Sequence, residues 1–344
     1  MVSLEFKRDR LIFRHGTSKY EWIIEPRYWR NPIIATLILS CIPALMYGYP
    51  NVLTMLTFAN IYAAVAIMMG LQTIGTARVN FGPQLYVGLG GYVASIFNLY
   101  FGLSPALTFI LTILVSVAVA LAISPIVLIA RGLYFALITL LLPLIFLQIT
   151  FIYAHIFGGE FGLSGMSPLI DLGRASWNYV TYCYLSLILM LIYLLIADKI
   201  MRSRFGISMA AINDNETAAE VLGVPVRNYK LFSYIFPSVC MAIVGWFIAH
   251  TFRTFSGVTY LSFFFLIKLL LIIIIGGRAT LYGAVAGAYF IAVVEEFLRA
   301  FGPIHYVIFP ILLIALVYML PEGVWGIYHK RHYRDYYPKL RVRR

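Results

Sequence analysis

One lysine lies in the middle of a long apolar run. Lys268 falls within TYLSFFFLIKLLLIIIIGG, which is long enough to cross a bilayer. Inserting an ammonium at mid-span costs about 2.5–3.5 kcal/mol. Each of the thirteen Leu, Ile and Phe residues between Leu261 and Ile275 favours insertion by about 0.3–0.6 kcal/mol, so insertion of the whole run is still favourable. The ammonium must then face a protein interior, a water-filled cavity or a carboxylate. The sequence leaves open whether Lys268 contacts a solute or forms a structural ion pair.

A second group of polar residues lies in a glycine-rich stretch, NFGPQLYVGLGGYVASI, at residues 80–96. Glycines at this density either let helices pack closely or mark a broken helix that lines a polar cavity. Close packing is the commoner arrangement, but the amides of Asn80 and Gln84 favour a cavity because lipid-facing amides are unfavourable. If the chain conducts a substrate across a membrane, the predicted substrate pathway comprises Asn80, Gln84, Tyr86, Gly88, Gly90, Gln148, Lys268, Gly276 and Gly277.

Three charged residues lie near the end of a later apolar run. Glu295–Arg299 and Glu296–Arg299 have the i,i+4 and i,i+3 spacings of ion pairs on a helix. We therefore expect an ion cluster at the membrane interface, with a structural role favoured over a role in transport. Acidic residues are otherwise nearly absent from the apolar runs. Proton- or sodium-coupled carriers usually need such groups, or broken-helix ion sites, near the bilayer midplane. Energy for any transport is therefore expected to come from another protein.

The sequence lacks the arrangements that support covalent catalysis or metal binding. The patterns GxxxxGK[ST], HExxH and GxSxG are absent, which excludes the P-loop, zinc-protease and serine-hydrolase signatures. Cys41, Cys183 and Cys240 lie in or near apolar runs without CxxC spacing. We expect no enzyme activity, no metal site and no cofactor bound by this chain.

The composition identifies the elements that must position these residues. Hydrophobic residues make up 62% of the chain, charged residues make up 12%, and the mean hydropathy is +0.88. Soluble globular proteins are about 45–50% apolar and about 25% charged. The long apolar runs and the absence of period-2 alternation exclude an outer-membrane barrel. The predicted fold class is all-α, a polytopic bundle of transmembrane helices.

The apolar runs predict ten spans, at residues 32–50, 52–74, 82–103, 105–130, 133–157, 178–197, 230–252, 259–276, 281–301 and 304–320. Ten spans place both termini on one side of the membrane. Lys and Arg concentrate in residues 1–30, in 198–230 and after Leu320, which the positive-inside rule assigns to the cytoplasm. The net charge of +12 is therefore explained by topology rather than by nucleic-acid binding.

This topology predicts three regions: a cytoplasmic N-terminal arm (1–31), a transmembrane domain (32–320) and a basic cytoplasmic tail (321–344). The arm has no signal-peptide pattern and is expected to lie on the membrane surface.

The loop at residues 158–177 is expected on the outer side, where it either meets a partner or substrate or is simply solvated.

The longest polar stretch between the termini is Ser203–Leu231. An N-cap at residues 213–215, with Asn213 and Glu216 spaced as a loose capping box, predicts a short helix. Gly223 is expected to end this helix in a left-handed conformation, and Pro225 prevents it from resuming. A polar helix held between two spans suits either docking of a soluble partner or an ordinary solvated loop.

Four segments resemble, in the right order, motifs of the membrane permease subunits of branched-chain amino acid ABC transporters, of the LivM-like type. They are INDNETAAEVLGVPVRNYKL from Ile212, RGLYFALITLLL from Arg131, IIGGRATLYGAVAGA from Ile274 and LPEGVWG from Leu320. The resemblance runs from about residue 60 to about residue 326. The chain departs from the family pattern at Pro83 and Gln84, at Lys268, and at Ala279 and Ala284.

The resemblance implies a cell-membrane subunit of a heteromeric, ATP-driven importer. A second permease subunit would share the pathway, two cytosolic ATPase subunits would hold ATP and Mg, and an extracytoplasmic binding protein would deliver the substrate. Family substrates include leucine, isoleucine and valine, and in some members urea, short amides or other amino acids. The residues implied in coupling to the ATPases are Asn215, Glu216, Ala219, Glu220, Gly223 and Arg227. The alternative is a secondary transporter or channel that works without ATPases.

Overall fold

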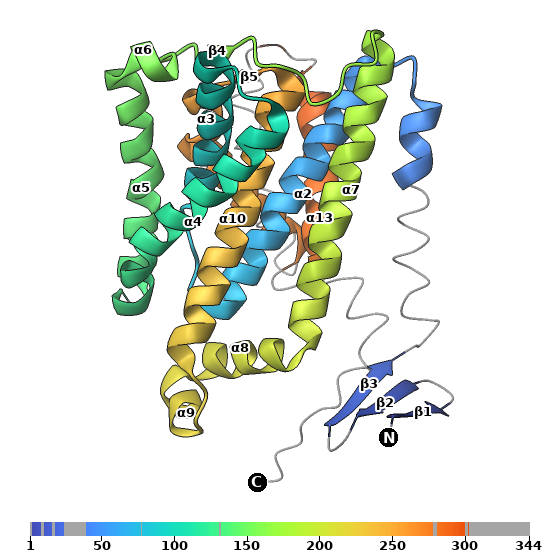
Figure 1. Cartoon of the computed structure of the whole chain (residues 1–344), viewed down its shortest axis with the longest axis vertical. Helices are drawn as coiled ribbons and strands as arrows, with labels where there is room; N and C mark the ends of the chain where they lie inside the picture. Colours follow the sequence, from blue (N-terminus) through green and yellow to red (C-terminus); the bar gives the residue numbers. More distant parts are fainter. Residues whose placement is uncertain are drawn as a thin grey trace.

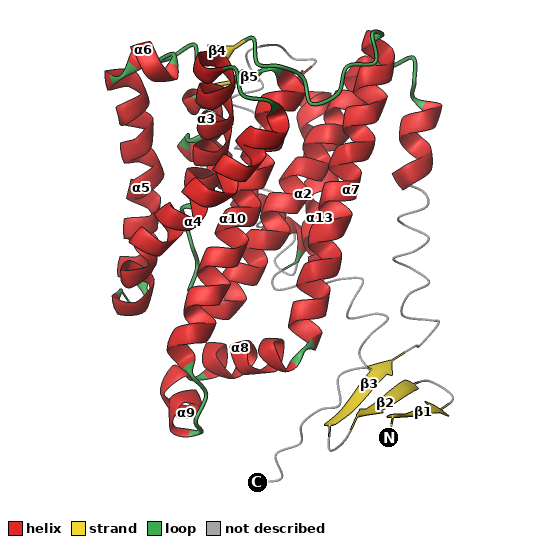
Figure 2. Ribbon diagram, viewed as in Figure 1, coloured by secondary structure: helices red, strands yellow, loops and turns green. Residues whose placement is uncertain are grey.

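The computed structural model describes residues 2–7, 10–15, 18–23, 39–76, 78–130, 132–277, 281–299 and 302. Long helices dominate this part of the chain (Figures 1 and 2). They are α2 (Pro50–Thr76), α3 (Pro83–Phe101), α4 (Pro105–Ile129), α5 (Leu133–Ile152), α7 (Ala175–Arg202), α10 (Val226–Phe252), α12 (Phe263–Gly276) and α13 (Leu281–Arg299). The shorter helices are α6 (Ala154–Phe157), α8 (Arg204–Asp214), α9 (Glu216–Val221) and α11 (Gly257–Tyr260).

Among the described residues, seven helical stretches are long and apolar enough to cross a membrane. They correspond to seven of the ten predicted spans, and the predicted helical class of the membrane region is confirmed. The glycine-rich helix α3 is not one of the seven, and most of its first thirteen residues are buried in protein. The predicted span 304–320 and part of 32–50 lie outside the described residues, so the total of ten stays a prediction.

Several predicted boundaries are corrected. The span predicted at 133–157 ends at Ile152, and α6 follows as a separate turn. The predicted separation of 82–103 from 105–130 is confirmed, because Gly102 adopts a left-handed conformation (φ 65°) between α3 and α4. Pro105 then begins α4, where a proline costs no helical hydrogen bond.

Strands also occur, although the sequence analysis predicted none. β1 (Val2–Lys7), β2 (Arg10–His15) and β3 (Ser18–Ile23) form an antiparallel sheet in that order, with Leu4 opposite Phe13 and Phe13 opposite Tyr20. The predicted surface-lying arm therefore contains a small sheet.

At the other end of the bundle, β4 (Leu163–Ser164) pairs with β5 (Thr254–Phe255).

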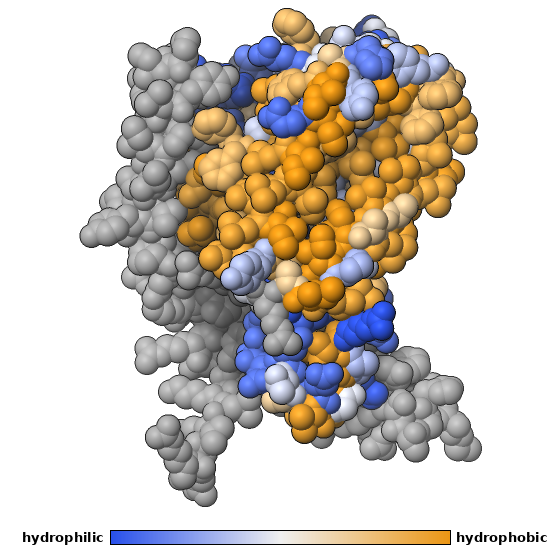
Figure 3. Space-filling model, turned by 90° about the vertical axis from the view of Figure 1, so that its left-hand side faces the viewer, coloured by the Kyte–Doolittle hydropathy of each residue, from blue (hydrophilic) through white to orange (hydrophobic). Residues whose placement is uncertain are grey.

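Helices α2 and α10 form the centre of the bundle. Helix α10 packs on α2, α3 and α4, whereas α2 also contacts α7, α12 and α13. Helices α4 and α5 are the least buried of the seven candidate spans. One face of the molecule shows a broad hydrophobic band with hydrophilic residues above and below it (Figure 3). The short helices α8 and α9 lie at one end of the bundle, and α6, β4 and β5 lie at the other (Figure 1).

The contact between α3 and α10 depends on glycine. A Cβ atom added at Gly90 would lie 1.9 Å from the carbonyl oxygen of Ala242, and one at Gly245 would lie 2.0 Å from that of Val87. Small residues let helix backbones approach closely in membranes, where dispersion forces replace the hydrophobic effect as the driving force. Close packing, the commoner arrangement for a glycine-rich stretch, is therefore the one observed here.

We expect Gly90→Val to separate α3 from α10, because the new side chain would collide with backbone that cannot rotate away. Overpacking of this kind costs about 1–3 kcal/mol or more. Thermal melting of the detergent-purified protein measures the loss. Gly70→Ala is the control, because a Cβ at Gly70 meets nothing within 4 Å and alanine favours the helix. Equal melting temperatures for wild type and Gly90→Val would contradict the packing argument.

Candidate functional site

The polar segment between α7 and α10 folds as two short helices. The Ser203 side chain caps α8 by accepting a hydrogen bond from the Phe205 N–H at 3.2 Å. The Asn215 side chain caps α9 by accepting one from the Ala218 N–H at 3.0 Å. The predicted short helix is therefore confirmed as α9, with Asn215 as its N-cap. The predicted Asn213–Glu216 capping box is wrong, because Asn213 lies inside α8, which was not predicted.

The end of α9 follows the prediction closely. Gly223 has a φ of 84°, and its N–H donates to the Glu220 carbonyl at 2.9 Å. The Val224 N–H donates to the Ala219 carbonyl at 3.1 Å. These two bonds define a Schellman motif, which satisfies the last carbonyls of the helix and needs a left-handed residue. Gly223 therefore sets the shape of the turn that leads into α10.

A small apolar cluster holds this segment together. Ile212 of α8, Ala219 of α9 and Val226 of α10 are buried against one another. Val221 and Leu222 point away from the cluster and are 83% and 82% exposed. Figure 3 shows hydrophobic surface at this tip, surrounded by hydrophilic residues. Exposed apolar side chains at the tip of a polar segment are typical of a surface that binds another protein.

Glu216 binds two cations of its own chain. One carboxylate oxygen pairs with the Lys230 ammonium on α10, and the other lies 3.5 Å from Nη2 of Arg78. Both cationic side chains are buried, whereas Glu216 is about one-third exposed. Buried charges require such partners because desolvation is costly. Glu216 was predicted as a coupling residue, and in this structure its carboxylate attaches α9 to the bundle. Glu220 and Arg227 are exposed.

The residues of the predicted pathway fall into separate groups. Asn80 donates a hydrogen bond to the Gln72 carboxamide at 2.7 Å and accepts one from the Gly82 N–H at 2.8 Å. Gln72 in turn donates to the Tyr234 carbonyl and to the Ser238 hydroxyl, each at 3.2 Å. These bonds join α2, α3 and α10 within the bundle.

Two further pathway residues lie on α3. Tyr86 donates to the Tyr234 hydroxyl at 2.9 Å, so it belongs to the same cluster. Gln84 is fully buried, and neither polar atom of its carboxamide has a hydrogen-bond partner in the part of the chain that the structure describes. Gln72, Tyr234 and Ser238 were not predicted from the sequence, although a glutamine inside an apolar run was a signal for Gln72.

The pathway glycines contact protein atoms. A Cβ at Gly88 would meet the Leu261 side chain, and one at Gly276 would lie 2.0 Å from the Gly283 carbonyl. Gly277 ends α12 with a φ of 109°. Gly283 and Gly287 have a GxxxG spacing and also pack tightly, because a Cβ at Gly287 would lie 2.2 Å from the Ile272 carbonyl.

Gln148 lies apart from these groups. Its side chain is exposed on α5, and among the described residues no hydrogen bond joins it to the Gln72–Asn80 cluster.

Lys268 is paired with a carboxylate. Its ammonium lies 2.7 Å from Glu295 on α13, 3.4 Å from the Tyr62 hydroxyl on α2, and 4.9 Å from the centre of the Tyr62 ring. The predicted Glu295–Arg299 pair is therefore wrong, because Glu295 binds Lys268. The predicted Glu296–Arg299 pair is confirmed at 2.9 Å.

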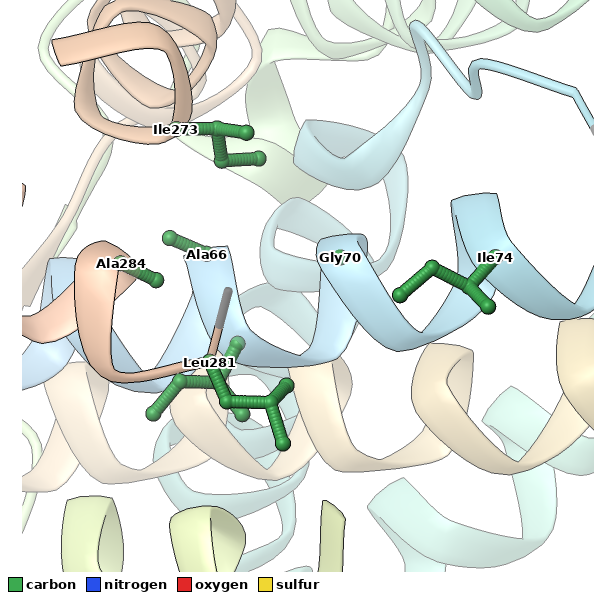
Figure 4. A pocket seen from close by; sticks show the side chains of 7 residues that line it. Ala66, Gly70, Ile74, Ile273, Leu281 and Ala284 are labelled. Atoms are coloured by element: carbon green, nitrogen blue, oxygen red, sulfur yellow. The ribbon is translucent and has the colours of Figure 1, made fainter. Parts of the chain in front are cut away.

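A small cavity lies between the same three helices, α2, α12 and α13 (Figure 4). Its volume is about 20 Å³, enough for roughly one water molecule. All of its lining side chains are apolar: Ala66, Ile67, Gly70, Ile74, Ile273, Leu281 and Ala284. This cavity is too small and too apolar to hold an amino acid. No group of three or more His, Cys, Asp or Glu in the described part of the chain could hold a metal ion.

The loop at residues 158–177 is anchored to the end of α10. The His250 ring bonds the Thr108 hydroxyl and the Ser167 carbonyl, each at 2.9 Å. Arg253 donates to the Met166 carbonyl at 2.9 Å. His250 therefore connects α10 to α4 and to the loop.

The same loop presents exposed groups at its surface. Phe161 is 95% exposed. Asp171 is also exposed, and hydrogen bonds from the Asn178 side chain and the Gly173 N–H lower the pKa of its carboxyl. The loop thus combines a fixed backbone with an exposed aromatic ring and a carboxylate.

Lys268→Met tests the ion pair on α12. We expect it to destabilise the protein by up to about 3–5 kcal/mol, because Glu295 loses its partner in a poorly hydrated site. The double variant Lys268→Met/Glu295→Gln should recover much of that loss. Thermal unfolding in detergent measures both effects. If the double variant melts no higher than the single one, the pair does not account for the stability of this site.

Comparison with known proteins places the chain in a family. The family model described as "Branched-chain amino acid transport system / permease component" matches residues 51–318. A curated relative from Methanocaldococcus jannaschii, described as a probable branched-chain amino acid transport permease protein LivH, is 25% identical over 305 residues, which cover 80% of this chain and 91% of the relative. No solved structure matches the chain. The LivM-like subtype stays a prediction. With its membrane-spanning helices, the chain belongs to the permease components of branched-chain amino acid transport systems.

Proposed function

We propose that this permease is driven by ATPase subunits that bind the tip of the α8–α9 segment. Permease components of ABC transport systems work with ATPases and binding proteins, and this subunit carries no catalytic domain of its own. The observation that supports docking at this tip is the exposure of Val221 and Leu222 on a segment whose other side is fixed to the bundle. ATP and Mg would be held by the ATPase subunits.

The attachment of the segment supports this role. A docking element transmits force only if it moves with the helices behind it. Helix α9 is held by the Ile212–Ala219–Val226 cluster, by the ion pairs of Glu216 and by the Schellman turn at Gly223. The apolar side chains at the tip remain accessible, so binding and attachment use different residues of the same short helix.

The topology follows from this assignment. An ATPase-docking tip lies in the cytoplasm, and the positive-inside rule places the basic segments there as well. On this basis we propose ten spans with both termini in the cytoplasm, and an extracytoplasmic position for residues 158–177. The exposed Phe161 and Asp171 of that loop would then face the binding protein that delivers substrate.

The substrate proposed for this chain is a branched-chain amino acid, with a second permease subunit completing the pathway. Polar groups that could form hydrogen bonds with such a solute are concentrated around Gln72, Asn80 and Tyr86, between α2, α3 and α10. Buried Gln84, which has no hydrogen-bond partner among the described residues, adds an amide that could bind a solute or water. Movement of the helices would have to open a path here, because the pathway glycines contact neighbouring helices in this structure.

Co-purification tests the central proposal. Affinity purification of the chain from its native membrane should recover P-loop ATPases in stoichiometric amount. Uptake by the reconstituted complex should require both ATP and the binding protein. Uptake by the purified chain alone in ATP-free liposomes would instead identify a secondary transporter or channel.

The tip itself is tested by Val221→Ser/Leu222→Ser. We expect the folded protein to melt as the wild type does, because both side chains are exposed, while ATPase recovery falls by about tenfold or more, as for apolar hot spots. Phe161→Ser is the matched control, because it removes an exposed apolar side chain at the opposite end. Unchanged ATPase recovery in the double variant would place the docking surface elsewhere.

A further inference from the structure

Arg78 is a buried cation in the connection between α2 and α3. It is 8% exposed, and its guanidinium contacts three other elements. One nitrogen donates to the carbonyls of Val127 and Ala130 at the end of α4. The other nitrogen lies 3.5 Å from the Glu216 carboxylate of α9. The guanidinium also lies 5.9 Å from the centre of the Phe135 ring in the first turn of α5.

The end of α4 depends on this contact. The last four carbonyls of a helix have no partner within the helix, and they form its partially negative end. Helix α4 has no basic residue in its last turn, and Gly132 (φ 54°) leads from it into α5. Arg78 supplies the missing donors from a different part of the chain. A planar guanidinium suits this position, because its five N–H donors point in fixed directions.

Glu216 connects the same guanidinium to the docking segment. Its second oxygen pairs with Lys230 in the first turns of α10. One carboxylate on α9 therefore bridges α10, through Lys230, and the α4–α5 junction, through Arg78. Each of the three side chains is supplied by a different segment of the chain, so a displacement of α9 changes both ion pairs at once.

We propose that Arg78 is a positioning residue that transmits the displacement of α9 to the adjoining ends of α4 and α5. These two helices are the least buried of the candidate spans, and α5 stands at the edge of the bundle (Figure 1). Helix α5 in particular makes few contacts with the rest of the bundle, so little internal packing opposes its movement. The proposal rests on ATPase docking at the α8–α9 tip, and it identifies the route by which docking would move the peripheral helices.

Arg78→Gln tests the route in the complete complex of permease subunits, ATPases and binding protein. The variant keeps a donor but loses the charge and the fork. We expect ATPases to co-purify in normal amount and ATP hydrolysis to continue, while the substrate transported per ATP hydrolysed falls by about tenfold, a size expected for loss of one coupling contact. Arg299→Gln is the matched control, since it removes a guanidinium from an exposed ion pair and should leave the ratio unchanged.

Glu216→Gln leaves Arg78 bound to the carbonyls of α4 and removes only the carboxylate that joins α9 to Arg78 and Lys230. Its transport-to-ATP ratio should fall in the same direction as that of Arg78→Gln. A normal ratio in both variants, with intact complexes, would overturn the relay while leaving ATPase docking in place. Failure of the wild-type chain to retain ATPases would instead overturn the proposed function.

A distance measurement gives a readout that a purely structural role would not change. Spin labels at Thr217→Cys on α9 and Ile129→Cys on α4, in a Cys41→Ser background, use exposed positions. In the wild-type background, we expect ATP to shift both helices together and to leave the distance between the labels nearly constant. With Arg78→Gln, ATP should change that distance. Equal distances with and without ATP in the variant would contradict the relay.

Discussion

A bilayer offers polar groups no water, so a buried donor, acceptor or charge that lacks a partner within the protein is costly. This constraint accounts for most of the contacts between helices that are distant in sequence. Asn60 of α2 donates to Ser186 of α7 at 3.0 Å and accepts a hydrogen bond from Tyr289 of α13. Gln72 joins α2 to α10 in the same way. The few polar side chains in the spans thus specify which apolar helices lie side by side.

Charges obey the same constraint more strictly. Lys268 is tolerated because Glu295 lies on the helix that packs against α12. Arg78 and Lys230 are tolerated because Glu216 folds back against the bundle. The chain has few acidic residues, and two of them, Glu216 and Glu295, each join separate helices. Glu216 differs from Glu295 because it lies in the segment that we propose docks the ATPases, so its ion pairs would both hold α9 in place and transmit its displacement.

The sequence predicted what local rules control. Apolar runs gave the spans, since insertion depends on length and hydrophobicity alone. Gly223 gave the end of α9, because only a residue that tolerates positive φ fits there. The helix α8 was missed because its N-cap, Ser203, follows directly on α7 without a loop. The partner of Glu295 was misassigned because spacing within one helix reveals Arg299, whereas Lys268 becomes a neighbour only when α12 packs on α13. The glycine-rich stretch allowed two arrangements, of which close packing was the commoner, and the backbone distances at Gly90 confirmed close packing.

The contacts of α9 explain how so short a helix could transmit the force that the proposed ATPase docking would apply. Six residues form too few hydrogen bonds to be stable alone, so α9 keeps its shape only through its cap, its Schellman turn and its ion pairs. Force applied at Val221 and Leu222 would therefore be transmitted to those contacts, because α9 cannot move as a separate rigid helix. Because the ion pairs end on α10 and at the α4–α5 junction, the direction of that force is set by where Lys230 and Arg78 lie. A longer, self-sufficient helix at this position could tilt without moving the bundle, whereas this one moves with the helices that hold it.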